Sequence, residues 1–91
     1  MRLLQRSPEV LTADFPQAKV IFDLETYTPY TLNHSAALLW DFLRQPRKER
    51  GLAAFLEKRY AISSRQARKD AGRFIKDLKK RGLLCLKVKI K

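Results

Sequence analysis

The sequence predicts an α+β fold, in which an N-terminal three-stranded antiparallel sheet is followed by three helices. Three short runs rich in β-forming residues, separated by turn-forming residues, occupy the first third of the chain. Three longer stretches with helical spacing of apolar residues follow them. The 91 residues are expected to form one domain, with its core over about residues 9–84 and a basic tail over residues 85–91.

The first strands are predicted from residue type and turn signals. Residues 1–8 are expected to form a loose arm that ends at a proline. A first strand is predicted over residues 9–13, and residues 14–17 are expected to turn because they include Asp and Pro. Residues 19–24 predict a better strand, since three bulky β-forming residues stand next to one another.

A hairpin is expected to join this strand to a third one. Residues 25–28 lie at its tip, and they lack the glycine that the tightest turns prefer, so the turn type stays open. The third strand is predicted over residues 28–32. Pro29 has no amide hydrogen, so this strand is expected to be short or to lie at an edge of the sheet.

The first helix is expected to begin at Asn33 or Ser35, because either side chain can accept the first free amide hydrogens. Residues 45–46 (Gln-Pro) are expected to end it. Its apolar residues cover nearly the whole circumference, which predicts the central element of the core. They are Ala36, Ala37, Leu38, Leu39, Trp40, Phe42 and Leu43.

Two more helices complete the predicted fold. The second covers about residues 48–60, and the third begins at Ser63, which matches a capping box with Gln66. Gly82 stands where a left-handed residue terminates a helix. After Leu84 the tail alternates apolar and basic residues, so it either adds a strand or frays. The apolar stripe of the third helix consists of Ala67, Ala71, Phe74, Ile75 and Leu78.

Several classes of protein are excluded by composition. A single Cys cannot form an internal disulfide. No apolar run approaches the roughly 18–20 residues of a membrane span, and the N-terminus lacks the apolar stretch of a signal peptide. We therefore expect a small, reduced cytoplasmic domain.

No residue pattern indicates catalysis, a cofactor or a metal. His34 stands alone, without Cys or acidic residues at metal-binding spacing. Cys85 has apolar neighbours and is expected to be a small buried or edge side chain; nearby basic residues leave a reactive thiol open. There is no glycine-rich phosphate loop and no obvious acid–base pair of carboxylates. The chain is expected to bind a partner without transforming it.

The charge of the chain is concentrated in its second half. Of the net charge of +11, residues 1–46 hold four basic and five acidic residues, whereas residues 47–91 hold sixteen and four. This asymmetry indicates either simple solubility or an anionic partner for the second half: nucleic acid, an acidic peptide or an anionic membrane surface.

A first candidate surface lies on the third helix. Arg68, Gly72, Ile75 and Lys79 follow one another at helical spacing and share one face beside the apolar stripe. Glycine inside a helix costs about 0.5–1 kcal/mol relative to alanine. Gly72 therefore either lets a partner's backbone approach or fits a tight crossing with a neighbouring helix. Ile75 is either part of the core or a partly exposed anchor.

A second candidate surface is the strand over residues 28–32. An edge strand has unpaired backbone groups, to which an extended peptide can add as a further strand. Tyr27 and Tyr30 offer aromatic contacts with polar tips, or else their rings cover the core.

Four segments of the chain form a recognisable pattern by their order and spacing. The first three are residues 20–26 (VIFDLET), 30–33 (YTLN) and 36–43 (AALLWDFL). The fourth, near the end of the chain, consists of Asp70, Ala71, Phe74, Ile75, Leu78 and residues 82–84. In order and spacing these residues resemble the PqqD family of small peptide-binding domains, also called RiPP recognition elements. The resemblance covers about residues 9–84. It implies a winged-helix-like arrangement of the sheet and the helices.

The resemblance also implies a function. Family members bind the leader segment of a ribosomally made precursor peptide and present it, without catalysis, to a modifying enzyme or protease of the same pathway. The leader adds to the third strand and lies in the cleft beside the third helix. Carried onto this sequence, the peptide-binding residues are Thr28, Pro29, Tyr30, Thr31, Leu32, Arg68, Gly72, Ile75, Lys76 and Lys79.

The charge of the third helix departs from the family, because many members have an acidic helix there. A basic helix suggests a leader rich in Asp and Glu, or a second anionic contact. The alternative function is a winged-helix nucleic-acid-binding protein whose third helix enters a major groove. Against this alternative, the helix has few base-reading side chains apart from Gln66. A plain protein-interaction module or a dimer is a third interpretation.

Overall fold

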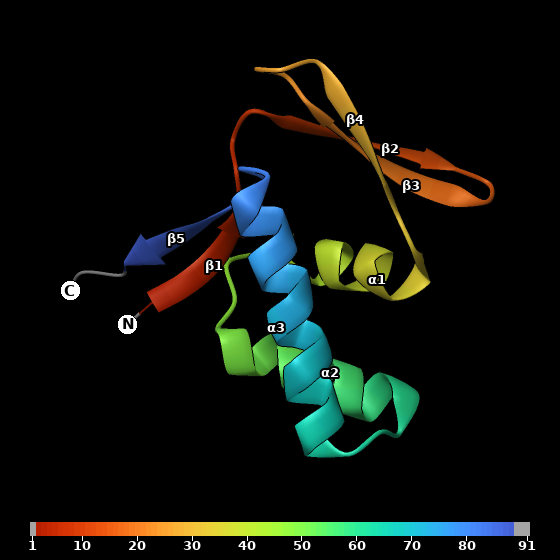
Figure 1. Ribbon diagram of the computed structural model, residues 1–91, viewed down its shortest axis with the longest axis vertical. Coiled ribbons are helices and arrows are strands. Elements are labelled where there is room, and N and C mark those ends of the chain that lie inside the picture. The colour runs from red at the N-terminus through yellow and green to blue at the C-terminus, as the bar shows by residue number, and fades with distance from the viewer. Residues whose placement is uncertain (1, 89–91) are drawn as a thin grey trace.

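The structure, a computed structural model, describes residues 2–88 and confirms the predicted α+β architecture. A three-stranded antiparallel sheet is followed by three helices, and a small two-stranded sheet lies beside them (Figure 1). The elements in chain order are β1 (Arg2–Arg6), β2 (Val10–Phe15), β3 (Ala18–Asp23), β4 (Thr28–Leu32), α1 (His34–Phe42), α2 (Glu49–Tyr60), α3 (Ser64–Lys80) and β5 (Leu84–Val88).

The larger sheet has the order β2-β3-β4, so β4 is an edge strand, as Pro29 predicted. The turn between β3 and β4 is closed by Asp23, whose Oδ1 accepts a hydrogen bond from the Glu25 amide at 2.9 Å. Tyr27 adopts the left-handed conformation, with φ of 56°, in the place that a glycine takes in tighter turns. Asp23 and Tyr27 together shape the turn of this hairpin, whose type the sequence left open.

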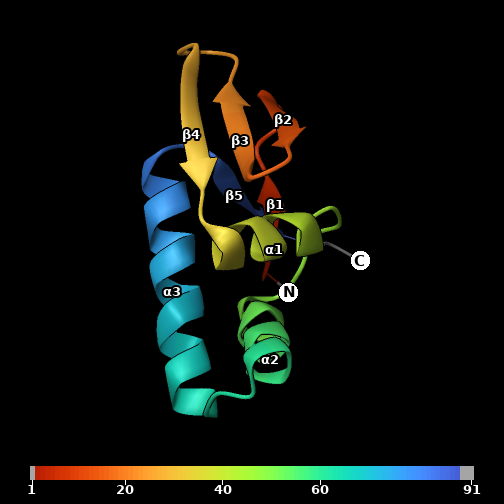
Figure 2. The ribbon, with the colours of Figure 1, turned by 90° about the vertical axis from the view of Figure 1, so that its right-hand side faces the viewer.

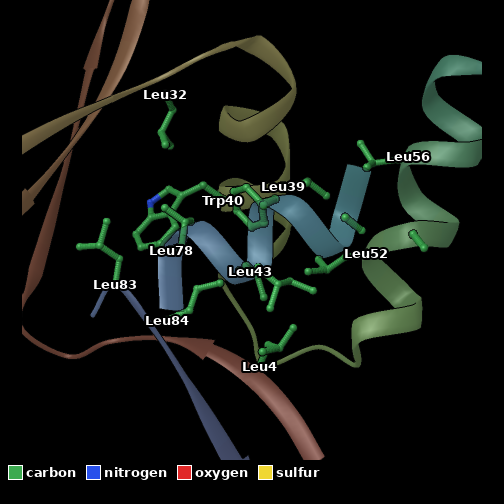
Figure 3. Packing of buried hydrophobic residues seen from close by; sticks show 14 of the residues in the cluster. Leu4, Leu32, Leu39, Trp40, Leu43, Leu52, Leu56, Leu78, Leu83 and Leu84 are labelled. Carbon is green, nitrogen blue, oxygen red and sulfur yellow. The ribbon is translucent and has the colours of Figure 1, made fainter. Parts of the chain in front are cut away.

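One face of this sheet packs on the helices. Ile21 and Leu32 point into the core from β3 and β4. The indole Nε1 of Trp40 in α1 donates a hydrogen bond of 2.8 Å to Thr12 Oγ1 in β2. Figure 3 shows leucine side chains from strands and helices converging around Trp40 and α3. The prediction that the first helix is the centre of the core is therefore consistent with the burial of Trp40, which is 0% exposed.

The prediction of a loose arm over residues 1–8 is wrong for β1. This strand pairs antiparallel with β5, and Leu4 stands opposite Leu86. The backbone of Leu4 also exchanges two hydrogen bonds with Arg47, of 2.7 and 2.9 Å. The tail was expected either to add a strand or to fray, and it forms strand β5 as far as Val88. Residues 89–91 of the tail lie outside the described residues. The first and last strands of the described residues therefore stabilise each other by pairing.

The helix ends follow their sequence signals closely. Asn33 Oδ1 accepts from the Ala36 amide at 2.8 Å, so Asn33 is the N-cap of α1. Ser63 caps α3 through the Gln66 amide, but the Gln66 side chain donates to Asp70 and makes only half of the expected capping box. Gly82 ends α3 with φ of +75°. The first helix stops at Phe42, before the predicted Gln-Pro end.

A partly exposed ion pair joins the sheet to α1 and predicts a pH dependence. Lys19 Nζ lies 2.9 Å from Asp41 Oδ1 and is also hydrogen-bonded to Asp14. These hydrogen bonds, the one to Asp14 first, raise the pKa of Lys19 above its ordinary value. The raised pKa contributes stability that is present below the unfolded-state pKa, about 10.4, and is lost as pH rises through the folded-state pKa. The stability difference between the wild type and Lys19→Met, measured by urea unfolding, should be constant between about pH 6 and pH 10 and shrink above pH 10. A difference that stays constant to about pH 12 would contradict this account.

Candidate peptide-binding groove

A groove runs along the edge strand β4 and the C-terminal part of α3. Figure 2 shows the end of α3 beside β4, which has β3 on its other side. The groove has a volume of about 290 Å³. Its lining residues are Pro29, Tyr30, Thr31 and Leu32 of β4 and Asp77, Leu78 and Arg81 at the end of α3. An edge strand and a helix thus frame a channel that can accept one more extended chain.

The groove has an apolar floor and a polar rim. Leu32 and Leu78 are buried at its base. On the rim, the Arg81 guanidinium lies 4.8 Å from the centre of the Tyr30 ring, and its Nε donates a hydrogen bond of 3.1 Å to Asp77 Oδ1. The hydrogen bond to Asp77 raises the pKa of Arg81, which keeps this side chain charged. The rim therefore presents a positioned cation beside an aromatic ring.

A larger cavity of about 780 Å³ continues along α3 and shares Asp77 with the groove. Its apolar wall includes Leu39, Leu56 and Phe74, and its charged residues are Asp70, Arg73 and Asp77. With Arg81 in the groove, the two hollows contain two arginines and two aspartates. The hollows themselves are therefore balanced in charge, and the positive charge that suggested an acidic leader lies elsewhere on the molecule.

Four of the predicted strand residues line the groove, namely Pro29, Tyr30, Thr31 and Leu32. Thr28 begins β4 and is not in the lining. Tyr30 packs against the core and contacts Arg81, and its contact with a peptide stays a prediction. Tyr27 lies at the hairpin and is largely exposed.

None of the predicted helix residues lines either hollow. At about 100° per residue, Asp77 lies about 140° around the helix from Gly72 and about 180° from Arg68. Ile75 is 5% exposed and is part of the core, which settles the choice left open for it. Arg68, Lys76 and Lys79 are exposed. Their binding role stays a prediction, but they occupy the flank of α3 away from the groove.

Asp77, Leu78 and Arg81 line the groove although no sequence pattern predicted them there. The spacing of Asp77 and Arg81, four residues apart on a helix, was visible and predicts a side-chain pair. No sequence signal indicated which flank of the apolar stripe would face β4. The interpretation of Gly72 as a tight helix crossing is wrong, because a Cβ placed there would meet nothing within 4 Å.

The other candidate residues lie outside the groove. His34 is the exposed first residue of α1, and Cys85 in β5 is half-buried, with its Sγ 3.6 Å from Gln5 Nε2. Within residues 2–88, no three His, Cys, Asp or Glu side chains gather as metal ligands would. No helix in this part of the chain is long and apolar enough to cross a membrane.

Comparisons with known proteins place this fold in a family. Two solved structures are similar to it. "Lasso peptide synthetase B1 complexed with the leader peptide" has a TM-score of 0.80 at 24% identity and covers 90% of this chain and 96% of its own. "TbiB1 in Complex with the TbiA(beta) Leader Peptide" has a TM-score of 0.81 at 20% identity and covers 88% and 93%. No curated protein matches the chain. The family model described as coenzyme PQQ synthesis protein D matches residues 18–84, from β3 to the start of β5. The chain therefore belongs to the PqqD family.

Proposed function

We propose that this chain binds the leader segment of a ribosomally made precursor peptide and presents it to a modifying or processing enzyme of the same pathway. The observation that carries the proposal is an edge strand, β4, that lines a groove with α3. PqqD family proteins are non-catalytic peptide-binding domains. The two similar structures are both named as complexes with a leader peptide, which supports the same role here.

In the proposed binding mode the leader adds to β4 as a fourth strand. Its backbone pairs with the edge of β4, which supplies affinity that depends little on sequence. Successive leader side chains then point to opposite faces of the sheet. One set enters the groove over Leu32 and Leu78, and the other set extends the outer face, where Leu11, Phe22 and Pro29 form one cross-strand row. Apolar leader side chains at every second position would fit the groove.

The larger cavity is proposed to receive leader residues beyond the paired strand. It adjoins the groove at Asp77, and its apolar wall is formed by helices. A volume of about 780 Å³ lies within the range of roughly 300–1,000 Å³ that is common for ligand pockets. A bulky apolar leader side chain anchored there would fix the register of the strand.

The test is a titration of the full chain with the leader segment of a precursor peptide encoded beside its gene and, separately, with duplex DNA, each across a salt series. We expect saturable leader binding that weakens only mildly with salt, because backbone pairing and apolar contacts carry it. Binding to DNA would instead weaken with a log–log slope of about −0.9 for each phosphate neutralised. Tight duplex binding without leader binding would support the nucleic-acid alternative and overturn the proposal.

Replacing Arg81 by alanine is expected to weaken leader binding about 3–10-fold, because the rim loses its positioned cation. The free energy of unfolding should hardly change, since exposed ion pairs contribute little to stability. Fluorescence anisotropy with a labelled leader measures the first effect and urea unfolding the second. Arg50→Ala, on the exposed side of α2, is the matched control. If Arg68→Ala weakens binding and Arg81→Ala does not, the flank predicted from the sequence is the correct one.

A further inference from the structure

The exposed side of α3 carries basic side chains and no acidic ones. At about 100° per residue, six basic residues fall within one arc of about 120°, with a single glycine among them. From the first to the last of these residues the arc runs about 22 Å along the helix, at 1.5 Å per residue. All six basic residues are exposed and none lines the groove or the larger cavity. This basic face consists of Arg65, Arg68, Lys69, Lys76, Lys79 and Lys80, around Gly72.

The charges of the basic face have no ion-pair partner among residues 2–88. In the part of the chain that the structure describes, ion pairs involve only Arg6, Lys19 and Arg81 as cations. Like charges four residues apart, such as Lys76 and Lys80, disfavour a helix. The sequence thus retains a row of cations on α3 that repel one another. An acidic partner surface would reduce this repulsion.

Gly72 provides an independent observation at the centre of this face. A Cβ at Gly72 would meet nothing within 4 Å, so packing inside the molecule does not require a glycine. Gly72 has an ordinary negative φ, so the backbone conformation does not require one either. Glycine nevertheless costs helix stability relative to alanine. Its absent side chain leaves room for another protein's backbone to approach α3 closely.

We infer that the basic face of α3 docks an acidic, helical protein surface, namely that of the enzyme to which the leader is presented. The inference rests on the proposed function, because it names the partner surface of the same carrier. Asp77 and Arg81 in the groove lie on the opposite flank of α3 from Arg68. Leader and enzyme therefore bind to different flanks of one helix and can be held at the same time.

A protein surface fits the basic face better than a nucleic acid does. A helix lying in a major groove has phosphates along both of its flanks. On α3 the flank facing the two hollows balances Asp70 and Asp77 against Arg73 and Arg81, so it offers phosphates no net positive charge. The basic face also contains no Asn, Gln, Ser or Thr with which to read base edges. A basic flank opposite a flank with no net charge matches a partner that covers a single side of the helix.

The experiment titrates the full chain with two probes, with and without saturating leader. The first is a synthetic 21-residue helical peptide with Glu along one face and Ala at the centre of that face; the second is a 20-base-pair DNA duplex. The variant Arg68→Glu/Lys69→Glu/Lys76→Glu is compared with Arg44→Glu/Arg50→Glu/Lys58→Glu, which makes the same change in net charge at exposed positions outside α3. Gly72→Leu keeps every charge and fills the central gap.

We expect the acidic helix to bind, with the leader bound or not, and the α3 triple variant to weaken it by at least about 30-fold. The control triple variant should weaken it less than about 5-fold, and Gly72→Leu should weaken it about 10-fold. Leader binding should persist in the α3 triple variant, which separates this inference from the proposed function. The inference is wrong if the acidic helix does not bind, if both triple variants act equally, if Gly72→Leu has no effect, or if the duplex binds more tightly through the same residues.

Discussion

Backbone N-methylation of the leader peptide at amides that face β4 is expected to weaken its binding about 10–100-fold at each position. A methyl group removes the donor and leaves a β4 carbonyl unpaired in the groove, which costs about 1–3 kcal/mol. A cost of 1.4 kcal/mol corresponds to a tenfold change in affinity. Because alternate amides of an antiparallel edge strand face its neighbour, the loss should recur at every second residue of the leader.

The measurement is fluorescence competition with a series of leader peptides that are each methylated at one amide. Peptides methylated at the intervening positions are the matched controls, since those amides point away from β4. They should bind within about 3-fold of the unmodified leader. A loss of affinity that is equal at all positions, or no loss at all, would show that the leader does not pair with β4. The protein has its wild-type sequence in every measurement. The result therefore cannot be attributed to a misfolded variant.

Trp40→Ala is expected to lower the free energy of unfolding by about 3–5 kcal/mol, the usual cost of removing a large buried aromatic side chain. Trp40 is 0% exposed and holds three elements together. The Arg6 guanidinium of β1 lies 4.5 Å from the centre of its ring, and the indole Nε1 donates to Thr12 of β2. A chain of this length has a total stability of about 5–15 kcal/mol. The loss therefore amounts to between about a fifth and the whole of this stability.

Urea unfolding followed by circular dichroism measures this loss. Trp40→Phe retains an aromatic ring beneath Arg6 but loses the indole hydrogen bond, and it should cost less than Trp40→Ala. Thr12→Val removes the same hydrogen bond from the other side and should cost about 1–2 kcal/mol. A loss below about 1 kcal/mol for Trp40→Ala would contradict the central place assigned to α1.

The elements of the fold were predictable because their signals are local. Asn33 and Ser63 cap their helices through amides three residues away, and Gly82 needs only its own φ. Pro29 marked β4 as an edge strand because a missing amide hydrogen disfavours a central position. The wall of the groove that β4 forms was therefore predictable from Pro29.

The helix half of the groove could not be read in the same way. A flank lies on each side of the apolar stripe of α3, and each contains charged residues at helical spacing. Arg68 and Gly72 lie on one flank, and Asp77 and Arg81 lie on the other. The local sequence does not indicate which of the two flanks faces β4. The basic residues drew the prediction to the flank of Arg68, which does not line the groove, because charge indicates an anionic partner without saying where it binds.

The sequence by itself determined three strands, three helices, the Ser63 and Gly82 signals at the ends of the third helix, and the family. These features depend on residues within a few positions of one another, or on the order of such segments. The tertiary structure alone decided that β1 pairs with β5, that the end of α3 turns Asp77 and Arg81 toward β4, and that the basic face of α3 lies outside both hollows. Gln5 and Cys85 meet across almost the whole chain. Such contacts are selected by burial and packing of the complete core, and no short stretch of residues encodes them.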